Sequence, residues 1–335
     1  MNRFLEQCED RKLTRLQHLA EAALHDYGLS GSGLTFIGQT FNAIFRVDAD
    51  GGERYVLRIH RFNVYDALEM RSELEWLDYL RKSADVLVSE PVANKHGDFV
   101  TELAIDDVPG RHYCTLLRWH DGRPLEEPAP NHQCYMAGEL IAKLHLRSTQ
   151  FVAPTGFTRP WRGIGYPQDC VKRIRSTAPP GLFSAKVLKV LDATADHVGE
   201  VMAEIRHGSD DFGMIHADLH GGNLLFHGRT VRAIDFDGCG WGHYLYDLAI
   251  TTYHLAPQSA RLVVAGYRRN RKLSWHELEK MRVFYALRIL DQLAYQLPDA
   301  MAAAQTLTRL RPYDLLGRKL PRGLPSLFET APGLN

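Results

Sequence analysis

The chain lacks any apolar segment of the kind that carries a protein into or across a membrane. Its opening residues, 1–10, have no signal-type apolar core, and no run in the 335 residues approaches the length of a membrane span. We therefore expect a cytoplasmic protein that has no membrane partner.

Paired cysteines are also lacking. The five cysteines are odd in number, scattered and without a C-x-x-C pair; they are Cys8, Cys114, Cys134, Cys170 and Cys239. This pattern indicates reduced thiols and argues against a disulfide framework or a zinc site.

An excess of charge of either sign is absent as well. The 40 basic and 40 acidic side chains give a formal net charge of zero, so composition offers no electrostatic argument for nucleic acid. The hydrophobic content of 45% is that of a globular protein, and the length suits about two domains. No internal repeat is visible.

The most informative stretch runs from residue 214 to residue 237. It reads as a loop followed by two short strands, 223–226 and 231–235, which a four-residue turn connects into a hairpin. If Phe226 pairs with Val231, antiparallel pairing places Asn223 beside Ile234, and so close to Asp235.

One more carboxylate belongs to the same place. Asp218 precedes Asn223 by five residues, on a glycine-rich loop that is free to turn towards it. Amide and carboxylate oxygens at one point suit Mg²⁺, and a carboxylate that binds no metal serves as a base. Phosphoryl transfer needs this combination.

These motifs resemble those of a known superfamily. The spacing His216-x-Asp218-x-x-x-x-Asn223, followed by Ile-Asp-Phe-Asp at 234–237, is similar to the catalytic and metal-binding segments of kinases. With Tyr-Asp-Leu-Ala at 246–249, it looks like the aminoglycoside phosphotransferase and choline kinase superfamily. Protein kinases usually have Arg before the catalytic Asp, whereas this chain has Ala217, which favours the small-molecule branch.

The resemblance implies a two-lobed, protein-kinase-like α+β fold that uses ATP and Mg²⁺. Residues 1–117 would form an N-terminal helix and a small antiparallel β lobe that binds nucleotide, 118–122 a hinge, and 123–335 a larger, mainly helical lobe. It also implies the roles of the following residues: Asp218 as the catalytic base, Asn223, Asp235 and Asp237 as metal ligands, His216 as a support of the site, and Asp247 as the acceptor of backbone N–H groups from the catalytic loop.

Residues in the first third are candidates for nucleotide binding. A helix is expected over 4–27, then strands on both sides of Gly38-x-Thr40-x-Asn42, a loop whose polar groups would cover phosphates or form an ordinary turn. In the third strand, 55–60, alternation places Val56 and Arg58 on one face. By resemblance, Val56 covers adenine and Arg58 contacts phosphates; a solvent-facing Arg at the strand edge is the alternative.

The rest of the small lobe supplies a partner for Arg58 and an edge for adenine. On a helix over 65–81 the resemblance points to Glu73 as that partner, with Glu69 and Glu75 left open. Runs at 86–88, 98–103 and 112–119 are expected to complete the sheet. In the related fold the backbone from Leu117 to Trp119 would bind the adenine edge.

Helices are expected in the remainder, at 137–145, 185–205 and 276–297. His145 is interpreted as a packed residue or a partner of the helix C-terminus. Residues 151–181 read as an insertion on the acceptor side or as a plain surface excursion. Their only carboxylate is Asp169, against five Lys and Arg residues, which favours an anionic or zwitterionic acceptor such as an amino acid or a phosphorylated metabolite.

Three other functions compete with a small-molecule kinase. One is a Ser/Thr protein kinase of the bacterial stress-response type, for which the phosphate acceptor would be a protein. Another is a nucleotide-binding regulator without transfer activity. The run His216-x-Asp218-x-His220 also resembles a metallohydrolase site, but no second cluster of ligands accompanies it.

Overall fold

The structure is a computed structural model that describes residues 2–39, 42–61, 66–106, 108–205, 208 and 210–296. The chain divides into two compact units: Met1–Asp121 with Val152–Arg159, and Gly122–Phe151 with Pro160–Asn335. The first boundary lies within 118–122. Residues 152–159 group with the first unit, although the sequence boundaries had assigned them to the second.

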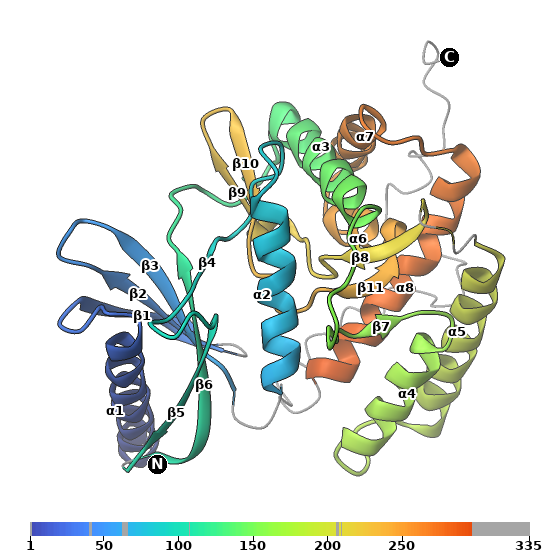
Figure 1. The fold of residues 1–335 in the computed structure, drawn as a ribbon. Helices are drawn as coiled ribbons and strands as arrows, with labels where there is room; N and C mark the ends of the chain where they lie inside the picture. The colour runs from blue at the N-terminus through green and yellow to red at the C-terminus, as the bar shows by residue number, and fades with distance from the viewer. Residues whose placement is uncertain are drawn as a thin grey trace. The chain divides into compact units, whose positions relative to one another are not determined.

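A six-stranded antiparallel sheet forms the centre of the first unit (Figure 1). Its strands are β1 (Gly33–Gln39), β2 (Ala43–Asp48), β3 (Arg54–Ile59), β4 (Pro91–Val92), β5 (Val100–Ile105) and β6 (Val108–Arg118). They lie in the order β1-β2-β3-β6-β4, and β5 also pairs with β6. An antiparallel sheet with helices, as expected, is confirmed.

The strand predicted at 86–88 is reduced to a single β-bridge residue, Val88. Val86 and Val88 are buried, but the strand that pairs with β6 is Pro91–Val92. A short apolar run gives the same signal in a buried loop as in a strand. Pro91 has no N–H to donate to a neighbouring strand. It is tolerated because β4 lies at the edge of the sheet.

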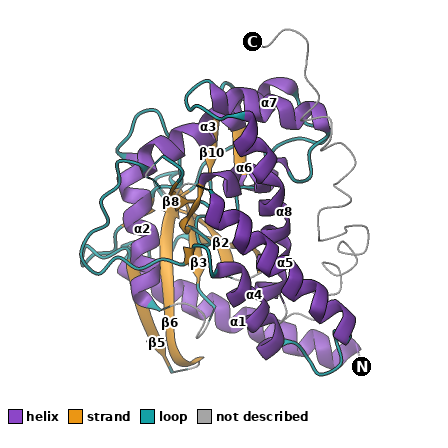
Figure 2. Ribbon diagram, turned by 90° about the vertical axis from the view of Figure 1, so that its right-hand side faces the viewer, coloured by secondary structure: helices purple, strands orange, loops and turns teal. Residues whose placement is uncertain are grey.

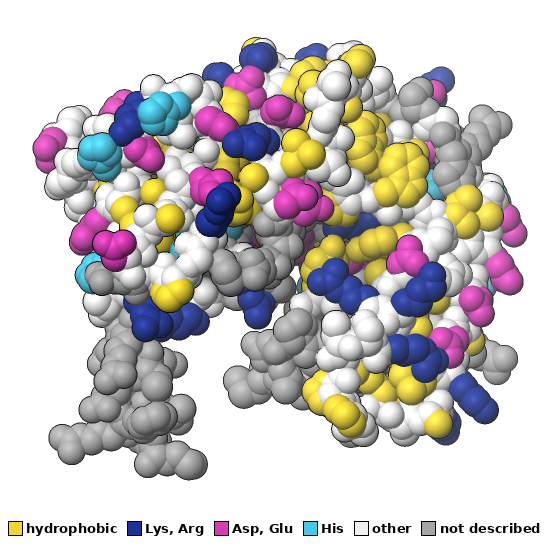
Figure 3. All heavy atoms as spheres, turned by 60° about the horizontal axis from the view of Figure 1, so that its bottom comes forward, with side chains coloured by type: hydrophobic (Ala, Val, Ile, Leu, Met, Phe, Trp, Pro, Cys, Tyr) yellow, Lys and Arg dark blue, Asp and Glu magenta, His cyan; other side chains and the backbone are white. Residues whose placement is uncertain are grey.

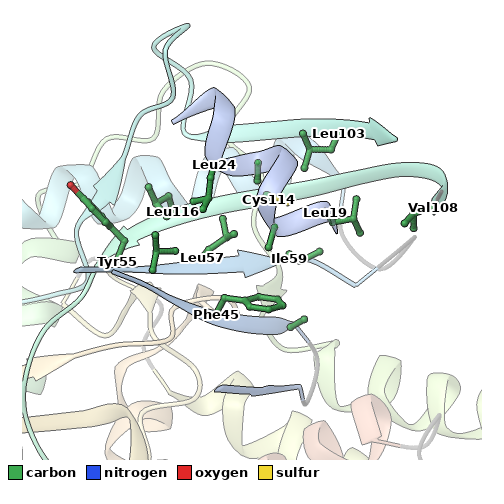
Figure 4. Packing of buried hydrophobic residues seen from close by; sticks show 14 residues of the cluster. Leu19, Leu24, Phe45, Tyr55, Leu57, Ile59, Leu103, Val108, Cys114 and Leu116 are labelled. Carbon is green, nitrogen blue, oxygen red and sulfur yellow. The ribbon is translucent and has the colours of Figure 1, made fainter. Parts of the chain in front are cut away.

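Helix α1 (Asn2–Asp26) covers this sheet through an apolar face. Leu19 and Leu24 lie against the strands whose buried side chains include Phe45, Leu57 and Leu116 (Figure 4). Burial of this apolar surface stabilises the unit, at roughly 25 cal/mol per Å².

Helix α2 (Ala67–Arg81) is tied to a segment that is distant in sequence. Asp66 caps its first turn by accepting from the Glu69 N–H at 2.7 Å. The expected start at Tyr65 lies outside the described residues. The Thr158 N–H donates to Ser72 Oγ at 2.9 Å, and Arg159 donates to the Glu69 carbonyl at 3.1 Å. These bonds explain why 152–159 belongs to the first unit.

The second unit is mainly helical (Figure 2). Its helices are α3 (Asn131–Ser148), α4 (Tyr166–Thr177), α5 (Ala185–Glu204), α6 (Tyr244–Thr252), α7 (Pro257–Arg268) and α8 (Trp275–Gln296). One small sheet contains β7 (Trp161–Arg162), β11 (Gly240–His243) and β8 (Phe212–Ile215), and the other contains β9 (Leu224–His227) and β10 (Thr230–Ala233). Residues 151–181 therefore include regular structure, β7 and α4, and are not a plain surface excursion.

The surface agrees with the balanced composition. On the face drawn in Figure 3, acidic and basic side chains are interspersed. None of the helices in the described part of the chain combines the length and the apolar character that a membrane crossing requires.

Two glycines allow α3 and α7 to approach closely. A Cβ on Gly138 would lie 1.9 Å from the Val263 carbonyl oxygen, and one on Gly266 would lie 2.0 Å from the Tyr135 carbonyl oxygen. Both obstacles are backbone atoms, which a side-chain rotation cannot move aside. The contact therefore excludes any side chain at either position.

We predict that Gly138→Ala lowers the free energy of unfolding by about 1–3 kcal/mol, because overpacking outweighs the gain of about 0.5–1 kcal/mol in helix propensity. Urea unfolding measures the change. Gly165→Ala is the matched control, since its Cβ would meet nothing within 4 Å and its backbone is helical. Equal midpoints for the two variants would contradict the packing argument.

Candidate active site

The hairpin at 224–233 has the register that the sequence predicted. Phe226 pairs with Val231, and the Ile234 N–H donates to the Asn223 carbonyl at 3.0 Å. This pairing places Asn223 beside the residue that precedes Asp235. Asn223 and the segment that carries Asp235 thus lie together at the open end of one hairpin.

The orientation of the Asn223 amide fits a cation site. Its Nδ2 donates to the Asp218 carbonyl oxygen at 2.9 Å and lies 3.5 Å from Asp218 Oδ2. The amide oxygen therefore faces away from Asp218. Asp235 is exposed and Asp237 is half-buried. Amide and carboxylate oxygens are the type of ligand that Mg²⁺ prefers.

Two residues at this site have a left-handed backbone. Ala217 has φ 63° and Asp235 has φ 64°, and they are the non-glycine residues with positive φ in the described part of the chain. Aspartate tolerates this conformation, whereas alanine pays about 1–2 kcal/mol for it. The turn at Ala217 needs an external support.

Asp247, in the first turn of α6, supplies that support. The His216 N–H donates to its Oδ2 at 2.9 Å and the Ala217 N–H to its Oδ1 at 2.7 Å. The carboxylate is fully buried. Burial alone would raise its pKa, but the hydrogen bonds from the His145 ring and the His216 N–H hold the pKa of Asp247 below its usual range. An ionised Asp247 follows, with the geometry that the resemblance implied.

His145 completes the support and was not identified from the sequence. Its Nε2 lies 3.1 Å from Asp247 Oδ2, and its Nδ1 lies 3.0 Å from the Tyr267 hydroxyl. Burial lowers the pKa of His145 despite the nearby carboxylate. A neutral ring that donates from Nε2 and accepts from Tyr267 satisfies both contacts. The sequence signal was one histidine at the end of a core helix, which does not show what lies opposite.

His216 links the loop to the hairpin. Its Nε2 lies 2.8 Å from the Ile234 carbonyl oxygen, its Nδ1 accepts from the Asp218 N–H at 3.3 Å, and its ring packs on buried Phe236. Both nitrogens are thus engaged by protein. His220 Nδ1 accepts from the Gly222 N–H at 3.0 Å. The metallohydrolase interpretation is therefore wrong; among the described residues no group of three His, Cys, Asp or Glu is placed to hold a metal.

Arg288 on α8 is a second residue whose contact the sequence did not reveal. Its Nη2 donates to Asp218 Oδ1, and its side chain is 14% exposed. Burial would lower the pKa of Arg288, but the charge of Asp218, with Tyr246 and Asp291, raises it. A permanent cation therefore lies against the carboxylate that was predicted to be the base.

In the first unit, the partner of Arg58 is Glu73, and neither Glu69 nor Glu75 takes its place. Arg58 Nη2 lies 2.8 Å from Glu73 Oε1, with both side chains almost completely buried. Arg58 Nε also donates to Thr115 Oγ1 at 3.1 Å. The alternative of a solvent-facing Arg at a strand edge is wrong, because β3 lies inside the sheet between β2 and β6.

His60 contacts the same Thr115 hydroxyl as Arg58. Its Nε2 lies 3.0 Å from Thr115 Oγ1. Burial, together with the charges of Arg58 and Arg159, holds the pKa of His60 well below its usual value. This neutral ring adds no second charge beside Arg58.

The expected adenine edge needs a correction. The Trp119 N–H donates to the Arg54 carbonyl at 2.9 Å, and Leu117 pairs with Val56 in the sheet. The Trp119 N–H is therefore not available to a base. Strand β6 ends at Arg118, within the run 112–119 that the sequence predicted.

The loop at 38–42 is described in part. Gly38 lies in β1, and the Asn42 side-chain oxygen accepts from the Arg61 N–H at 3.3 Å. Thr40 lies outside the described residues. The amide of Asn42 thus fastens the start of β2 to the end of β3.

Comparisons with known proteins agree with this geometry. The chain is 26% identical to amicoumacin kinase of Bacillus subtilis (strain 168) over 245 residues, 71% of this chain and 68% of that protein. It is 30% identical to homoserine kinase of Neisseria meningitidis serogroup B (strain ATCC BAA-335 / MC58) over 198 residues, 59% of this chain and 58% of that protein.

A solved structure, that of a microcompartment-associated aminopropanol kinase, is 27% identical and has a TM-score of 0.73, covering 87% of this chain and 93% of the other. A model of the phosphotransferase enzyme family matches residues 34–284. This match includes every motif discussed above and most of the chain, which therefore belongs to the phosphotransferase enzyme family.

Proposed function

We propose that the protein transfers the γ-phosphate of ATP, with Mg²⁺, to a hydroxyl of a small molecule. The observation that carries the proposal is the gathering of Asp218, Asn223 and the Asp235 segment at the end of one hairpin. The kinases to which the chain is similar act on small molecules by name, which favours such an acceptor over a protein. A cytoplasmic location stays a prediction.

In this proposal Asp218 is the catalytic base. It binds the acceptor hydroxyl and takes its proton as the oxygen attacks phosphorus. The Asn223 amide oxygen and Asp235 would hold Mg²⁺, with Asp237 as a further ligand. When it is bound with ATP, Mg²⁺ neutralises charge on the phosphate oxygens.

Residues of the first unit would bind the nucleotide, in the two-lobed arrangement of kinases. Arg58 is proposed to contact the α- and β-phosphates, and its pair with Glu73 holds the guanidinium in one orientation. Gly38, Thr40 and Asn42 are proposed to lie near the phosphates, and Val56 near adenine, with Leu117 and Trp119 at its edge. The stretch 118–122 would then act as a hinge.

The buried support of the loop also has a role. Asp247 and His145 fix the backbone of His216 and Ala217, so Asp218 projects from a rigid turn. A base must be held within a fraction of an ångström to act efficiently. We regard His145 and Asp247 as positioning residues.

The overall test is a phosphorylation screen with Mg·ATP over alcohols, amino acids, aminoglycosides and a protein mixture. Transfer to a small molecule supports the proposal. Transfer to protein alone would replace it with the protein-kinase function.

We predict that Asp218→Asn lowers kcat by about 10²–10⁴-fold, the usual contribution of a general base, while Mg·ATP affinity stays largely unchanged. Steady-state kinetics and titration calorimetry measure the two effects. Asp169→Asn, an exposed carboxylate paired with Lys172, is the control that should retain activity. Parallel loss of transfer and of ATP binding would contradict this division of roles.

We predict that Asp235→Asn removes most of the Mg²⁺ dependence of nucleotide affinity, because it deletes a charged ligand. Asparagine is chosen because it tolerates the left-handed backbone that Asp235 adopts. Calorimetric titration of ATP with and without Mg²⁺ gives the readout. An unchanged ratio of the two affinities would exclude Asp235 from the metal site.

We predict a pH-dependent difference between the wild type and His145→Gln. The folded state lowers the pKa of His145 below its usual 6.5, so the unfolded chain binds more protons below that pH. The contribution of His145 to stability is present above pH 6.5 and is lost as pH falls. The wild type should lose up to about 1.4 kcal/mol per pH unit relative to the variant. Urea unfolding at pH 7.5 and 5.5 measures this; parallel pH profiles would contradict it.

A further inference from the structure

Arg288 is held at the proposed base by one of its donors. Its Nη2 donates to Asp218 Oδ1, while its Nε and Nη1 have no hydrogen-bond partner among the described residues. These two nitrogens are not buried, and the side chain keeps 14% of its surface exposed. A planar guanidinium thus presents free N–H groups next to the carboxylate that must receive the acceptor hydroxyl.

Asp291, whose charge also acts on Arg288, does not engage these donors. Asp291 accepts from the Tyr166 hydroxyl at 2.5 Å and from the Tyr246 hydroxyl at 2.6 Å, and Arg162 Nε lies 3.9 Å away. Asp291 is buried and already has its partners.

Arg162 adds further unused donors to this cluster. It is 4% exposed, stacks on Tyr166, and its Nε and Nη1 make no hydrogen bond. Buried donors without acceptors are costly, at about 1–3 kcal/mol each. Around Asp218 and Asp291, guanidinium donors therefore outnumber the acceptors that the described residues provide, so an acceptor group of a ligand could be bound here.

We propose that Arg288 determines acceptor specificity, and that the acceptor is a small alcohol carrying an anionic group, a carboxylate or a phosphate, a few bonds from the reacting hydroxyl. This inference rests on the proposed function. The anionic group accepts hydrogen bonds from the free N–H groups of Arg288, while the hydroxyl donates to Asp218.

The transfer step balances in this arrangement. The acceptor oxygen forms a bond to the γ-phosphorus, the bond from that phosphorus to the β–γ bridging oxygen breaks, and ADP leaves with the electron pair. The acceptor proton passes to Asp218 and then to solvent. Arg288 changes neither charge nor bonding in this step, so it acts in binding and orientation.

The test compares matched alcohols that differ in one group. Homoserine and glycerate represent carboxylates, their carboxamides are the neutral counterparts, and glycerol 3-phosphate against glycerol tests phosphate. We expect kcat/KM for one anionic class to exceed that of its neutral counterpart by about 10²-fold or more, because a polar site rejects the analogue that leaves it unpaired.

Variants connect this selectivity to Arg288. Arg288→Gln should raise the acceptor KM about 100-fold and abolish the preference for the anionic form, while KM for ATP stays near the wild-type value. Arg288→Lys should recover part of the preference, since it keeps the charge and loses the planar array of N–H donors. Arg173→Gln, an exposed Arg over the Tyr295 ring in the same unit, is the matched control. Urea midpoints check that each variant folds.

Two results would overturn the inference in distinguishable ways. If neutral or cationic alcohols are phosphorylated as well as anionic ones, and Arg288→Gln leaves that ratio unchanged, the acceptor assignment is wrong while the kinase function stands. If ATP binds but no alcohol is phosphorylated, the proposed function fails and this inference fails with it.

Discussion

A single buried carboxylate, Asp247, holds the loop that carries Asp218. It accepts the consecutive N–H groups of His216 and Ala217, which point to one place only because Ala217 has a left-handed backbone. Without that acceptor the two N–H groups would be buried and unpaired, and the strained turn would relax. His145, neutral and hydrogen-bonded to Tyr267, completes the network. The direction in which Asp218 leaves the chain is therefore decided by residues that do not touch a substrate.

In the first unit, a buried cation is likewise held in place by hydrogen-bonding and charged partners. Arg58 is buried with Glu73, and Thr115 accepts from its Nε. Removing either member would leave the other as an uncompensated buried charge, a situation that costs several kcal/mol. The helix that carries Glu73 is fastened by Thr158 through the neighbouring Ser72. A segment encoded after α3 thus helps to hold a cation on β3.

The basic residues of 151–181 are arranged differently from what composition alone would suggest. The basic residues of 151–181 do not act as one surface: Lys172 pairs with Asp169 and Arg175 with Asp192, both exposed, whereas Arg162 is buried beside Asp291. Exposed pairs of this type contribute little, about 0–1 kcal/mol. The proposed preference for an anionic acceptor therefore rests on Arg288 and Arg162 and not on the composition of 151–181.

Local spacing was sufficient to predict the hairpin, the neighbourhood of Asn223 and Asp235, and the position of Asp218, because these residues lie within one turn and two short strands. Resemblance selected Glu73 from three candidates. Sequence did not reveal the contacts of His145 and Arg288, which lie 102 and 70 residues from their carboxylate partners. It also predicted a strand at 86–88 where only Val88 forms a β-bridge, and it misplaced the group to which 152–159 belongs. Alternation and spacing report which way a side chain faces within its own element. Which group lies opposite it is decided only when distant helices pack, since packing brings together residues that no local period connects.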